Sequence, residues 1–255
     1  MMAGKAVYAG EIVPLSLSDY LGEPACVVFF SGCNFDCGYC QNWRLKRSKE
    51  EDLTEIEKVK KAISENKLVT ACKVTGGEPL LQLDALLEIG RFVKSIGLKF
   101  GIDTNGSLPE ALAKVMPILD LVSIDIKAEL REESYRRVTG LRSPPVAEVI
   151  RSIEIAMRSK AQVELRMVVI PGYNDSVSTI KSISENLKGL GYEEKASRGE
   201  ACLNLIEFVP ENAFDEEFRR IRNPSVSLLR ELALASGLKN VRITHRGIGI
   251  CQPVS

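Results

Sequence analysis

The stretch Cys33-Asn34-Phe35-Asp36-Cys37-Gly38-Tyr39-Cys40 places three thiols within eight residues. Cysteines in the spacing C-x₃-C-x₂-C can bind three irons of a [4Fe–4S] cluster, and the motif itself provides no ligand for the fourth iron. A structural zinc site or a closed cluster would require four protein ligands. A small molecule can bind directly to an open iron, so the motif predicts chemistry at the cluster rather than electron storage alone.

The composition excludes several classes of function. The chain has 255 residues, 45% of them hydrophobic, and 34 Lys and Arg balance 34 Asp and Glu. This balance produces no net field that would attract nucleic acid or a charged membrane. The apolar runs are too short to span a bilayer, and residues 1–11 lack the apolar stretch of a secretory signal. We therefore expect a cytoplasmic protein that consists of a single domain.

The other four cysteines are not expected to form disulfides, because the total of seven is odd and the chain is not a small secreted scaffold. Cys26, Cys72 and Cys202 lie in apolar segments typical of strands, where a thiol packs as a small hydrophobic group. Cys251, near the end of the chain, has no predicted role. An open iron is readily oxidised, so we expect a reducing, low-oxygen environment.

Apolar segments typical of strands alternate along the chain with amphipathic segments typical of helices. The predicted strands are 26–30, 68–74, 98–102, 121–126, 163–170, 202–208 and 240–244, and the predicted helices are 54–65, 83–95, 109–116, 146–159, 177–188 and 225–235. This alternation indicates βαβ units and a parallel sheet. About six units are too few for a closed eight-stranded barrel. The predicted fold class is therefore α/β, with an open, partial parallel β/α barrel.

The single domain, residues 1–255, is expected to have three parts. Residues 25–210 would form the barrel core, residues 1–24 a hairpin or lid before the first barrel strand, and residues 211–255 a C-terminal extension. The segments 189–200 and 211–224 are polar and interrupt the alternation. We expect them to lie outside the barrel, where a partner protein could dock.

Unusual residues follow the predicted strands, at the edge where parallel α/β barrels bind their ligands. The cysteine motif follows the first strand, residues 75–79 (TGGEP) follow the second, and residues 103–106 (DTNG) follow the third. Glycines allow the backbone to approach a ligand closely. Both short motifs are also typical of turns that merely end a strand.

Charged side chains occur within the fourth and fifth predicted strands. Asp125 and Lys127 share one face, as do Glu164 and Arg166. Each pair could be a buried ion pair, because an unpaired charge in an apolar strand is strongly unfavourable. Charges from successive strands also predict a polar barrel mouth suited to a zwitterionic ligand.

Taken in order, the motifs CNFDCGYC, TGGEP, DTNG, DLVSIDIK, RMVVIPGYND and LIEFVP resemble the radical S-adenosylmethionine superfamily. Within it they resemble the activating enzymes of glycyl-radical enzymes, such as those of pyruvate formate-lyase and anaerobic ribonucleotide reductase. The resemblance implies that a reduced [4Fe–4S] cluster cleaves S-adenosylmethionine to methionine and a 5′-deoxyadenosyl radical. That radical would abstract a hydrogen atom from a glycine of a partner glycyl-radical enzyme. The electron would come from a donor of the flavodoxin or ferredoxin type.

The resemblance also assigns residues. Cys33, Cys37 and Cys40 would ligate the cluster. The residues implied to line S-adenosylmethionine are Tyr39, Gly76, Gly77, Glu78, Asn105, Lys127, Arg166 and Asn212. Those implied to hold Na⁺ or K⁺ beside its carboxylate are Asp103, Thr104, Ser123 (through its carbonyl) and Asp125. His245, the only histidine of the chain, is not expected to take part in catalysis.

Two other functions fit the same motif. A radical enzyme acting on a small molecule, such as a 7-carboxy-7-deazaguanine synthase, would also need three cysteines, although such enzymes often have a longer interval before the second one. A non-enzymatic module would instead close a zinc or iron–sulfur site with Cys26 or His245 as the fourth ligand. The colour and the iron and sulfide content of anaerobically purified protein distinguish this module from the enzymes.

Overall fold

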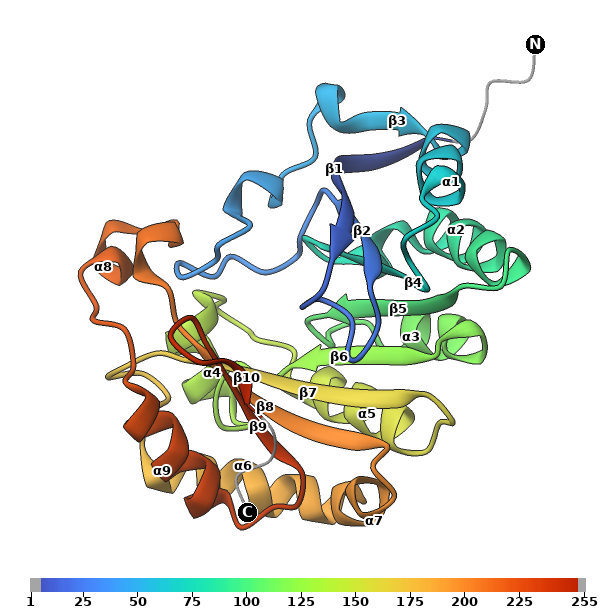
Figure 1. Cartoon of the computed structure of the whole chain (residues 1–255). Helices are drawn as coiled ribbons and strands as arrows, with labels where there is room; N and C mark the ends of the chain where they lie inside the picture. Colours follow the sequence, from blue (N-terminus) through green and yellow to red (C-terminus); the bar gives the residue numbers. More distant parts are fainter. Residues whose placement is uncertain (1–5, 252–255) are drawn as a thin grey trace. The chain divides into compact units, whose positions relative to one another are not determined.

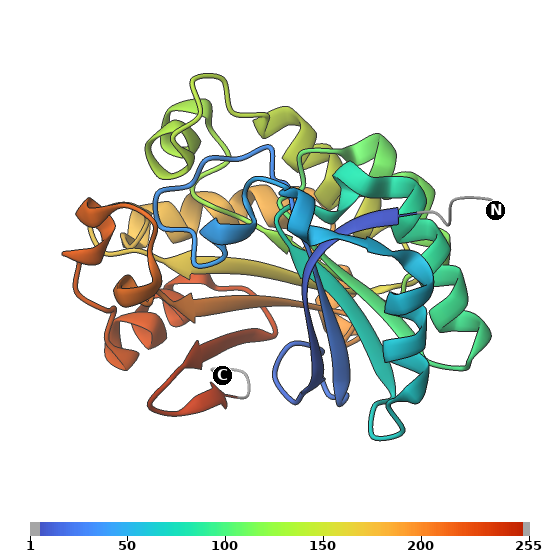
Figure 2. The same ribbon diagram turned by 90° about the horizontal axis from the view of Figure 1, so that it is seen from above.

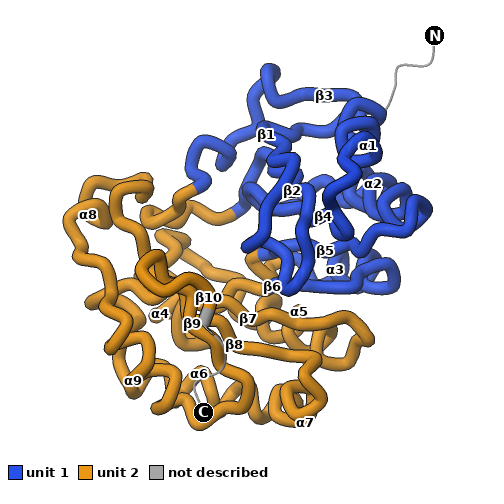
Figure 3. Tube along the Cα trace, in the orientation of Figure 1, with its two compact units in different colours: residues 1–34, 42–104, 108–123 blue, residues 35–41, 105–107, 124–255 orange. Residues whose placement is uncertain are grey.

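The computed structural model describes residues 6–251, and the chain divides into two compact units (Figure 3). Unit 1 comprises residues 1–34, 42–104 and 108–123, and unit 2 comprises residues 35–41, 105–107 and 124–255. Residues 1–5 of the predicted hairpin or lid, residues 252–255 of the predicted extension and the side chain of Cys251 lie outside the described part. That the whole chain is one domain stays a prediction.

The strands of unit 1 lie in the order β5-β4-β2-β1-β3. Their bounds are β1 Ala6–Ser16, β2 Ala25–Phe30, β3 Leu53–Glu55, β4 Ala71–Gly76 and β5 Lys99–Thr104. The strands β2, β4 and β5 are parallel, and the register places Cys26 opposite Cys72 and Cys72 opposite Phe100. β1 runs antiparallel to both β2 and β3. The residues before the first barrel strand therefore pair with that strand as the other arm of a hairpin.

The helices of unit 1 are α1 Ile56–Glu65, α2 Leu83–Ser95 and α3 Pro109–Val115, with short 3₁₀ turns η1 Trp43–Leu45, η2 Glu50–Asp52, η3 Pro79–Gln82 and η4 Met116–Ile118. α1 and α2 pack side by side (Figure 2). The prediction that the first helix begins at Thr54 was wrong, because Thr54 pairs with Val7 as part of β3. A β-branched residue suits that strand, and the helix begins at Ile56, whose side chain is buried.

The strands of unit 2 lie in the order β7-β8-β9-β10. Their bounds are β7 Gln162–Val169, β8 Ala201–Glu207, β9 Val241–His245 and β10 Gly249–Cys251. β7, β8 and β9 are parallel, and β10 returns antiparallel to β9. The strand β6, Leu121–Asp125, is divided between the units after Ser123. The seven predicted strands are thus confirmed to within a few residues. β1 lies in the segment predicted as a hairpin or lid, whereas β3 and β10 were not predicted.

The helices of unit 2 are α4 Glu132–Thr139, α5 Val146–Met157, α6 Val177–Gly189, α7 Tyr192–Ser197, α8 Glu216–Arg219 and α9 Val226–Ser236. α6 and α9 pack side by side (Figure 1), and each begins at a serine cap, Ser176 and Ser225, whose side chain accepts a backbone N–H. The helices α4, α7 and α8 were not predicted, because they are short and at least half of their residues are charged. α7 and α8 occupy the two polar segments that interrupt the alternation.

Within residues 6–251, we find no helix with the length and apolar character needed to cross a membrane.

Gly90 tests how tightly α2 packs on the sheet of unit 1. A Cβ at Gly90 would lie 2.4 Å from Phe100 Cε1 and 2.8 Å from Ile118 Cδ1. Replacing glycine by alanine inside a helix normally stabilises by about 1 kcal/mol, whereas overpacking a core costs about 1–3 kcal/mol. We expect Gly90→Ala to lower the free energy of unfolding, measured by urea denaturation.

The matched control is Gly189→Ala at the end of α6, where a Cβ would meet no atom within 4 Å. This variant should be as stable as the parent, or more stable by about 0.5 kcal/mol. A stabilised Gly90→Ala variant would contradict the described packing of α2.

Candidate functional site

The cysteine motif lies in an irregular loop between β2 and η1. Cys33, in unit 1, donates its backbone N–H to the carbonyl of Lys46 at 3.0 Å. Cys37 and Cys40, in unit 2, are joined by a turn in which Cys40 N donates to Cys37 O at 3.2 Å. Cys37 is buried, and Cys33 and Cys40 are half-buried.

Three cysteine thiols in a loop without regular structure fit the donor set of an iron–sulfur cluster. Across residues 6–251, however, no three His, Cys, Asp or Glu side chains converge into an arrangement ready to hold a metal ion. The fit therefore rests on the kind and spacing of the donors rather than on preformed coordination.

The TGGEP turn lies directly against the backbone that leads into Cys33. Gly77 N donates to Phe30 O and Glu78 N to Gly32 O, both at 2.8 Å. A Cβ on Gly77 would stand 2.0 Å from the carbonyl oxygen of Gly32, and a Cβ on Gly76 would stand 2.2 Å from that of Phe30. The two glycines are thus required by the close approach of β4 to the end of β2. Their contact with S-adenosylmethionine stays a prediction.

Glu78 joins the ends of two parallel strands. Its side chain is fully buried, and Oε1 accepts from Leu80 N at 3.1 Å and from the Thr104 hydroxyl at 2.9 Å. The first bond caps η3, and the second connects the turn after β4 with the end of β5. Glu78 and Thr104 are therefore brought together in unit 1, although the sequence analysis gave them different ligands.

Lys73 is a buried cation that the sequence analysis did not identify. Its side chain is 0% exposed, and Nζ lies 2.6 Å from Asp103 Oδ1 and 3.1 Å from Ser123 Oγ. The available signal was a lysine inside the otherwise apolar strand Ala71–Gly76. Two residues predicted to help hold Na⁺ or K⁺ thus lie against an ammonium group. Cation binding at these residues stays a prediction.

Asp125 and Lys127 form the ion pair that was one of the two sequence interpretations. Lys127 Nζ lies 2.7 Å from Asp125 Oδ2 and 5.7 Å from the centre of the Tyr39 ring. Burial lowers the pKa of Lys127, but the negative charge of Asp125 and its hydrogen bond to Lys127 outweigh this effect and raise the pKa well above its ordinary value. Burial also raises the pKa of Tyr39 well above its ordinary value. At neutral pH Lys127 is therefore a charged ammonium, and the Tyr39 ring near it is a neutral phenol.

The segment 211–224 holds the cysteine loop within unit 2. Asp215 N donates to Gly38 O at 2.9 Å, and a Cβ on Gly38 would stand 2.2 Å from Asp215 Oδ2. The Tyr39 ring packs against Phe218 of α8, with centroids 6.0 Å apart, and Phe218 packs against Tyr173 at 4.9 Å. Phe218 thus anchors the segment in an aromatic cluster, and docking of a partner on it stays a prediction.

Asn105 and Asn212 differ in how they are placed. Asn105 is buried, and its Oδ1 accepts from Ser107 N at 2.9 Å and from Ser107 Oγ at 2.6 Å. These bonds form the turn that the DTNG sequence also suggested. Asn212 is exposed in the 3₁₀ turn η5, Pro210–Asn212. Their contacts with S-adenosylmethionine stay predictions.

A row of polar side chains crosses three parallel strands of unit 2. Arg166 Nε donates to Glu164 Oε2 at 2.8 Å, and Asn204 Nδ2 donates to Glu164 Oε1 at 2.9 Å. The Thr244 hydroxyl donates to Asn204 Oδ1 at 3.0 Å. The predicted ion pair of β7 is thus extended onto β8 and β9. An asparagine in the apolar strand Ala201–Glu207 was the signal for Asn204.

Glu207 is the last residue of β8, and its carboxylate accepts hydrogen bonds from residues near the C-terminus. It accepts from Arg246 N at 2.7 Å and from Asn223 Nδ2 at 2.9 Å, and it lies 3.7 Å from His245 Nε2. Burial raises the pKa of Glu207, but the donors from Arg246 and Asn223 outweigh it and lower the pKa below the usual value. His245 therefore lies beside a structural carboxylate.

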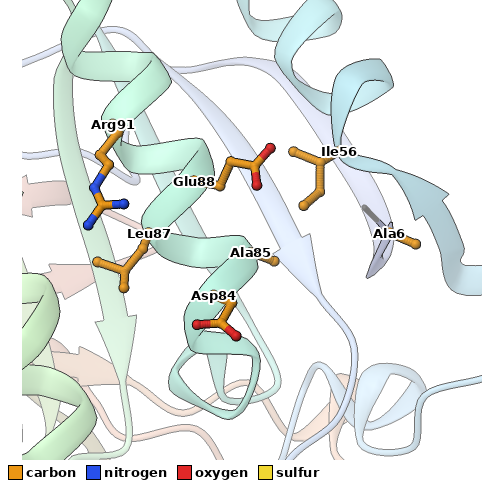
Figure 4. A pocket seen from close by; sticks show the side chains of 7 residues that line it. All are labelled: Ala6, Ile56, Asp84, Ala85, Leu87, Glu88 and Arg91. Atoms are coloured by element: carbon orange, nitrogen blue, oxygen red, sulfur yellow. The ribbon is translucent and has the colours of Figure 1, made fainter. Parts of the chain in front are cut away.

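A surface pocket of about 570 Å³ lies in unit 1, away from the predicted set of residues (Figure 4). It is lined by Ala6, Ile56, Asp84, Ala85, Leu87, Glu88 and Arg91. Glu88 pairs there with Lys60 at 2.9 Å. None of the lining residues belongs to the cysteine loop or to the turns that follow the strands, so the pocket is not part of the candidate site.

Comparisons with known proteins agree on a family. The model of the radical SAM superfamily matches residues 27–182. A protein of Methanocaldococcus jannaschii, named as a candidate glycyl-radical enzyme activating enzyme, is 30% identical over 89% of this chain and 90% of its own length. The pyruvate formate-lyase-activating enzyme of Clostridium pasteurianum is 30% identical over 66% of this chain and 71% of its own length.

One solved structure supports the fold. A radical SAM methyltransferase from Sphaerobacter thermophilus superposes with a TM-score of 0.66, at 18% identity, over 91% of this chain and 69% of that chain. At this identity the likeness concerns the fold alone. The predicted fold class, an open, partial parallel β/α barrel, is confirmed.

Glu207 gives a test of the described electrostatics. A carboxyl group whose pKa is lowered on folding stabilises the protein above its unfolded pKa, near 4.5, and loses this effect as the pH falls through the folded value. We expect Glu207→Gln to be less stable than the parent at pH 7, and the difference to shrink below pH 4.5. Urea denaturation at a series of pH values measures it.

The control is Glu231→Gln, which removes one carboxylate from an exposed position of α9. A stability difference for Glu207→Gln that stayed constant down to the acid transition would be inconsistent with a lowered pKa.

Proposed function

Because this chain belongs to the radical S-adenosylmethionine superfamily, we propose that Cys33, Cys37 and Cys40 hold a [4Fe–4S] cluster at which S-adenosylmethionine is cleaved. The spacing of these three cysteines, with no fourth cysteine in the motif, is the observation that carries the proposal. The family implies the cluster and the cosubstrate. When reduced and bound, the cluster would supply the electron that splits the sulfonium into methionine and a 5′-deoxyadenosyl radical.

The residues around the loop would bind and orient S-adenosylmethionine and would exclude water from it. Tyr39 and Phe218 cover the loop, and the Cys37 thiol is only 6% exposed. Lys127 would present a positive charge toward the carboxylate of the cosubstrate, since its pKa keeps it protonated at neutral pH. No side chain need act as a general acid or base. The residues proposed to line the cosubstrate are Tyr39, Gly76, Gly77, Glu78, Asn105, Lys127, Arg166 and Asn212.

The proposed substrate is the α-carbon of a glycine in a partner glycyl-radical enzyme. The support is the Methanocaldococcus jannaschii relative, which is similar over nearly the whole of both chains and is named for this activation. The Clostridium pasteurianum activating enzyme adds support over a shorter span. An electron donor of the flavodoxin or ferredoxin type is proposed with it, because the first step requires one electron from outside the chain.

Substituting a cluster cysteine should remove the cluster and the reaction. We expect Cys37→Ala, made and reconstituted without oxygen, to lose the iron, sulfide and visible absorbance of the parent and to form no 5′-deoxyadenosine. The same loss is expected for Cys33→Ala and Cys40→Ala. Iron and sulfide analysis and chromatography of the products measure both effects.

Cys26→Ala and Cys72→Ala are matched controls, because these thiols lie buried opposite one another on β2 and β4. They should lose about 1 kcal/mol of stability but keep the cluster and cleavage. Normal 5′-deoxyadenosine formation by Cys37→Ala would show that the cluster has been assigned to the wrong residues.

The substrate is tested by mixing reduced protein and S-adenosylmethionine with each candidate glycyl-radical enzyme that a neighbouring gene is found to encode. We expect a glycine-centred doublet in the electron paramagnetic resonance spectrum, because hydrogen abstraction leaves the unpaired electron on the α-carbon. Omitting S-adenosylmethionine should abolish the signal.

A different outcome would favour the small-molecule alternative. If no neighbouring glycyl-radical enzyme gave the doublet while a small metabolite was converted together with cosubstrate cleavage, the activating function would be rejected and the radical chemistry kept.

A further inference from the structure

A lysine ammonium is fully enclosed in unit 1 and lies close to three oxygen atoms there. Lys73 lies on β4, and its Nζ contacts Asp103 Oδ1 at 2.6 Å, Ser123 Oγ at 3.1 Å and the carbonyl oxygen of Asp19 at 2.5 Å. An ammonium has three N–H donors and no acceptor. The contacts with Ser123 and Asp19 are hydrogen bonds, and the contact with Asp103 is an ion pair.

This arrangement fixes a positive charge beside Asp103. Removing a charged side chain from water costs several kcal/mol, which close pairing and hydrogen bonds must offset. Lys73 is 0% exposed, so water cannot replace Asp103 as its partner, whereas Asp103 itself is 15% exposed. The folded state of unit 1 thus depends on keeping this carboxylate neutralised by a cation.

The other residues implied to hold Na⁺ or K⁺ also have partners within their own units. The Thr104 hydroxyl donates to Glu78 at 2.9 Å, and Asp125 pairs with Lys127 at 2.7 Å. Each of the two carboxylates therefore already has a lysine against it. A metal cation sharing Asp103 Oδ1 would lie close to the ammonium, and like charges at such a distance repel strongly where water is excluded.

We infer that the Lys73 ammonium takes the place of the monovalent cation at Asp103 and Ser123, so that this protein needs neither Na⁺ nor K⁺ there. The contacts of Lys73 with Asp103 and Ser123 do not depend on the proposed function. Only its consequence for S-adenosylmethionine rests on that function: binding of the cosubstrate should not depend on the alkali metal present.

Removing the Lys73 ammonium while keeping the Asp103 carboxylate should create a site that a small cation can occupy. We would compare the parent and Lys73→Ala in potassium, ammonium and tetramethylammonium chloride at one ionic strength, using cluster-free protein. Potassium and ammonium are small enough to replace the lost Nζ, whereas tetramethylammonium is too large and donates no hydrogen bond.

The expected readout is the midpoint of thermal unfolding. The parent should give the same midpoint in the three salts. Lys73→Ala should unfold at a lower temperature, and potassium or ammonium should raise its midpoint over that in tetramethylammonium by about 2–4 °C. The double variant with Lys73→Ala and Asp103→Asn keeps the cavity but lacks the carboxylate, so its midpoint should be the same in the three salts.

Two results would overturn the inference: a parent whose midpoint is raised by potassium but not by tetramethylammonium, or a Lys73→Ala variant that responds to the salts no more than the double variant. Should Lys73→Ala not fold in tetramethylammonium, its recovery in ammonium alone supports the inference, and failure in all three salts with a folded double variant contradicts it.

A second measurement separates this inference from the proposed function. With reconstituted parent protein, the dissociation constant for S-adenosylmethionine should be unchanged, within twofold, between potassium and tetramethylammonium. A tenfold weaker affinity without potassium would reject the inference and leave the proposed function intact. Absence of binding and cleavage in every salt would reject the proposed function, and the unfolding experiment would still decide the role of Lys73.

Discussion

The contact between the backbones of Gly77 and Gly32 is the constraint on which the candidate site depends. The space there admits no side chain, since a Cβ on Gly77 would stand 2.0 Å from the carbonyl oxygen of Gly32. Two backbone hydrogen bonds accompany the contact, and they fix the direction in which the chain leaves β2. Cys33 follows Gly32 directly. The position of the first thiol therefore depends on Gly77, which has no side chain and directly follows β4.

Buried charge is the second organising feature, and each unit neutralises its own. Lys73 meets Asp103 at 2.6 Å in unit 1, and Lys127 meets Asp125 at 2.7 Å in unit 2. Breaking one partner of such a pair is strongly destabilising, because it leaves an uncompensated charge out of water. Each pair therefore holds strand ends of its own unit in place.

Aromatic packing explains how the irregular loop is held without secondary structure of its own. Phe218 of α8 contacts both Tyr39 and Tyr173, so α8, a helix of only four residues, is stabilised by tertiary contacts rather than by helix propensity. Any partner that binds segment 211–224 would consequently act directly on the loop that carries Cys37 and Cys40.

The sequence by itself determined the thiol spacing, the alternation of strands and helices and the family, because these depend on local order and on periods that can be read along the chain. It also indicated both charge pairs on single strands, Asp125–Lys127 and Glu164–Arg166, since alternate residues of a strand share a face. Only the tertiary structure decided that Lys73 neutralises Asp103, that Asn204 continues the polar row from Glu164, and that Phe218 covers Tyr39. Each of these contacts joins residues from separate elements, and side-chain partners across a sheet follow from strand order and register, which no local pattern encodes.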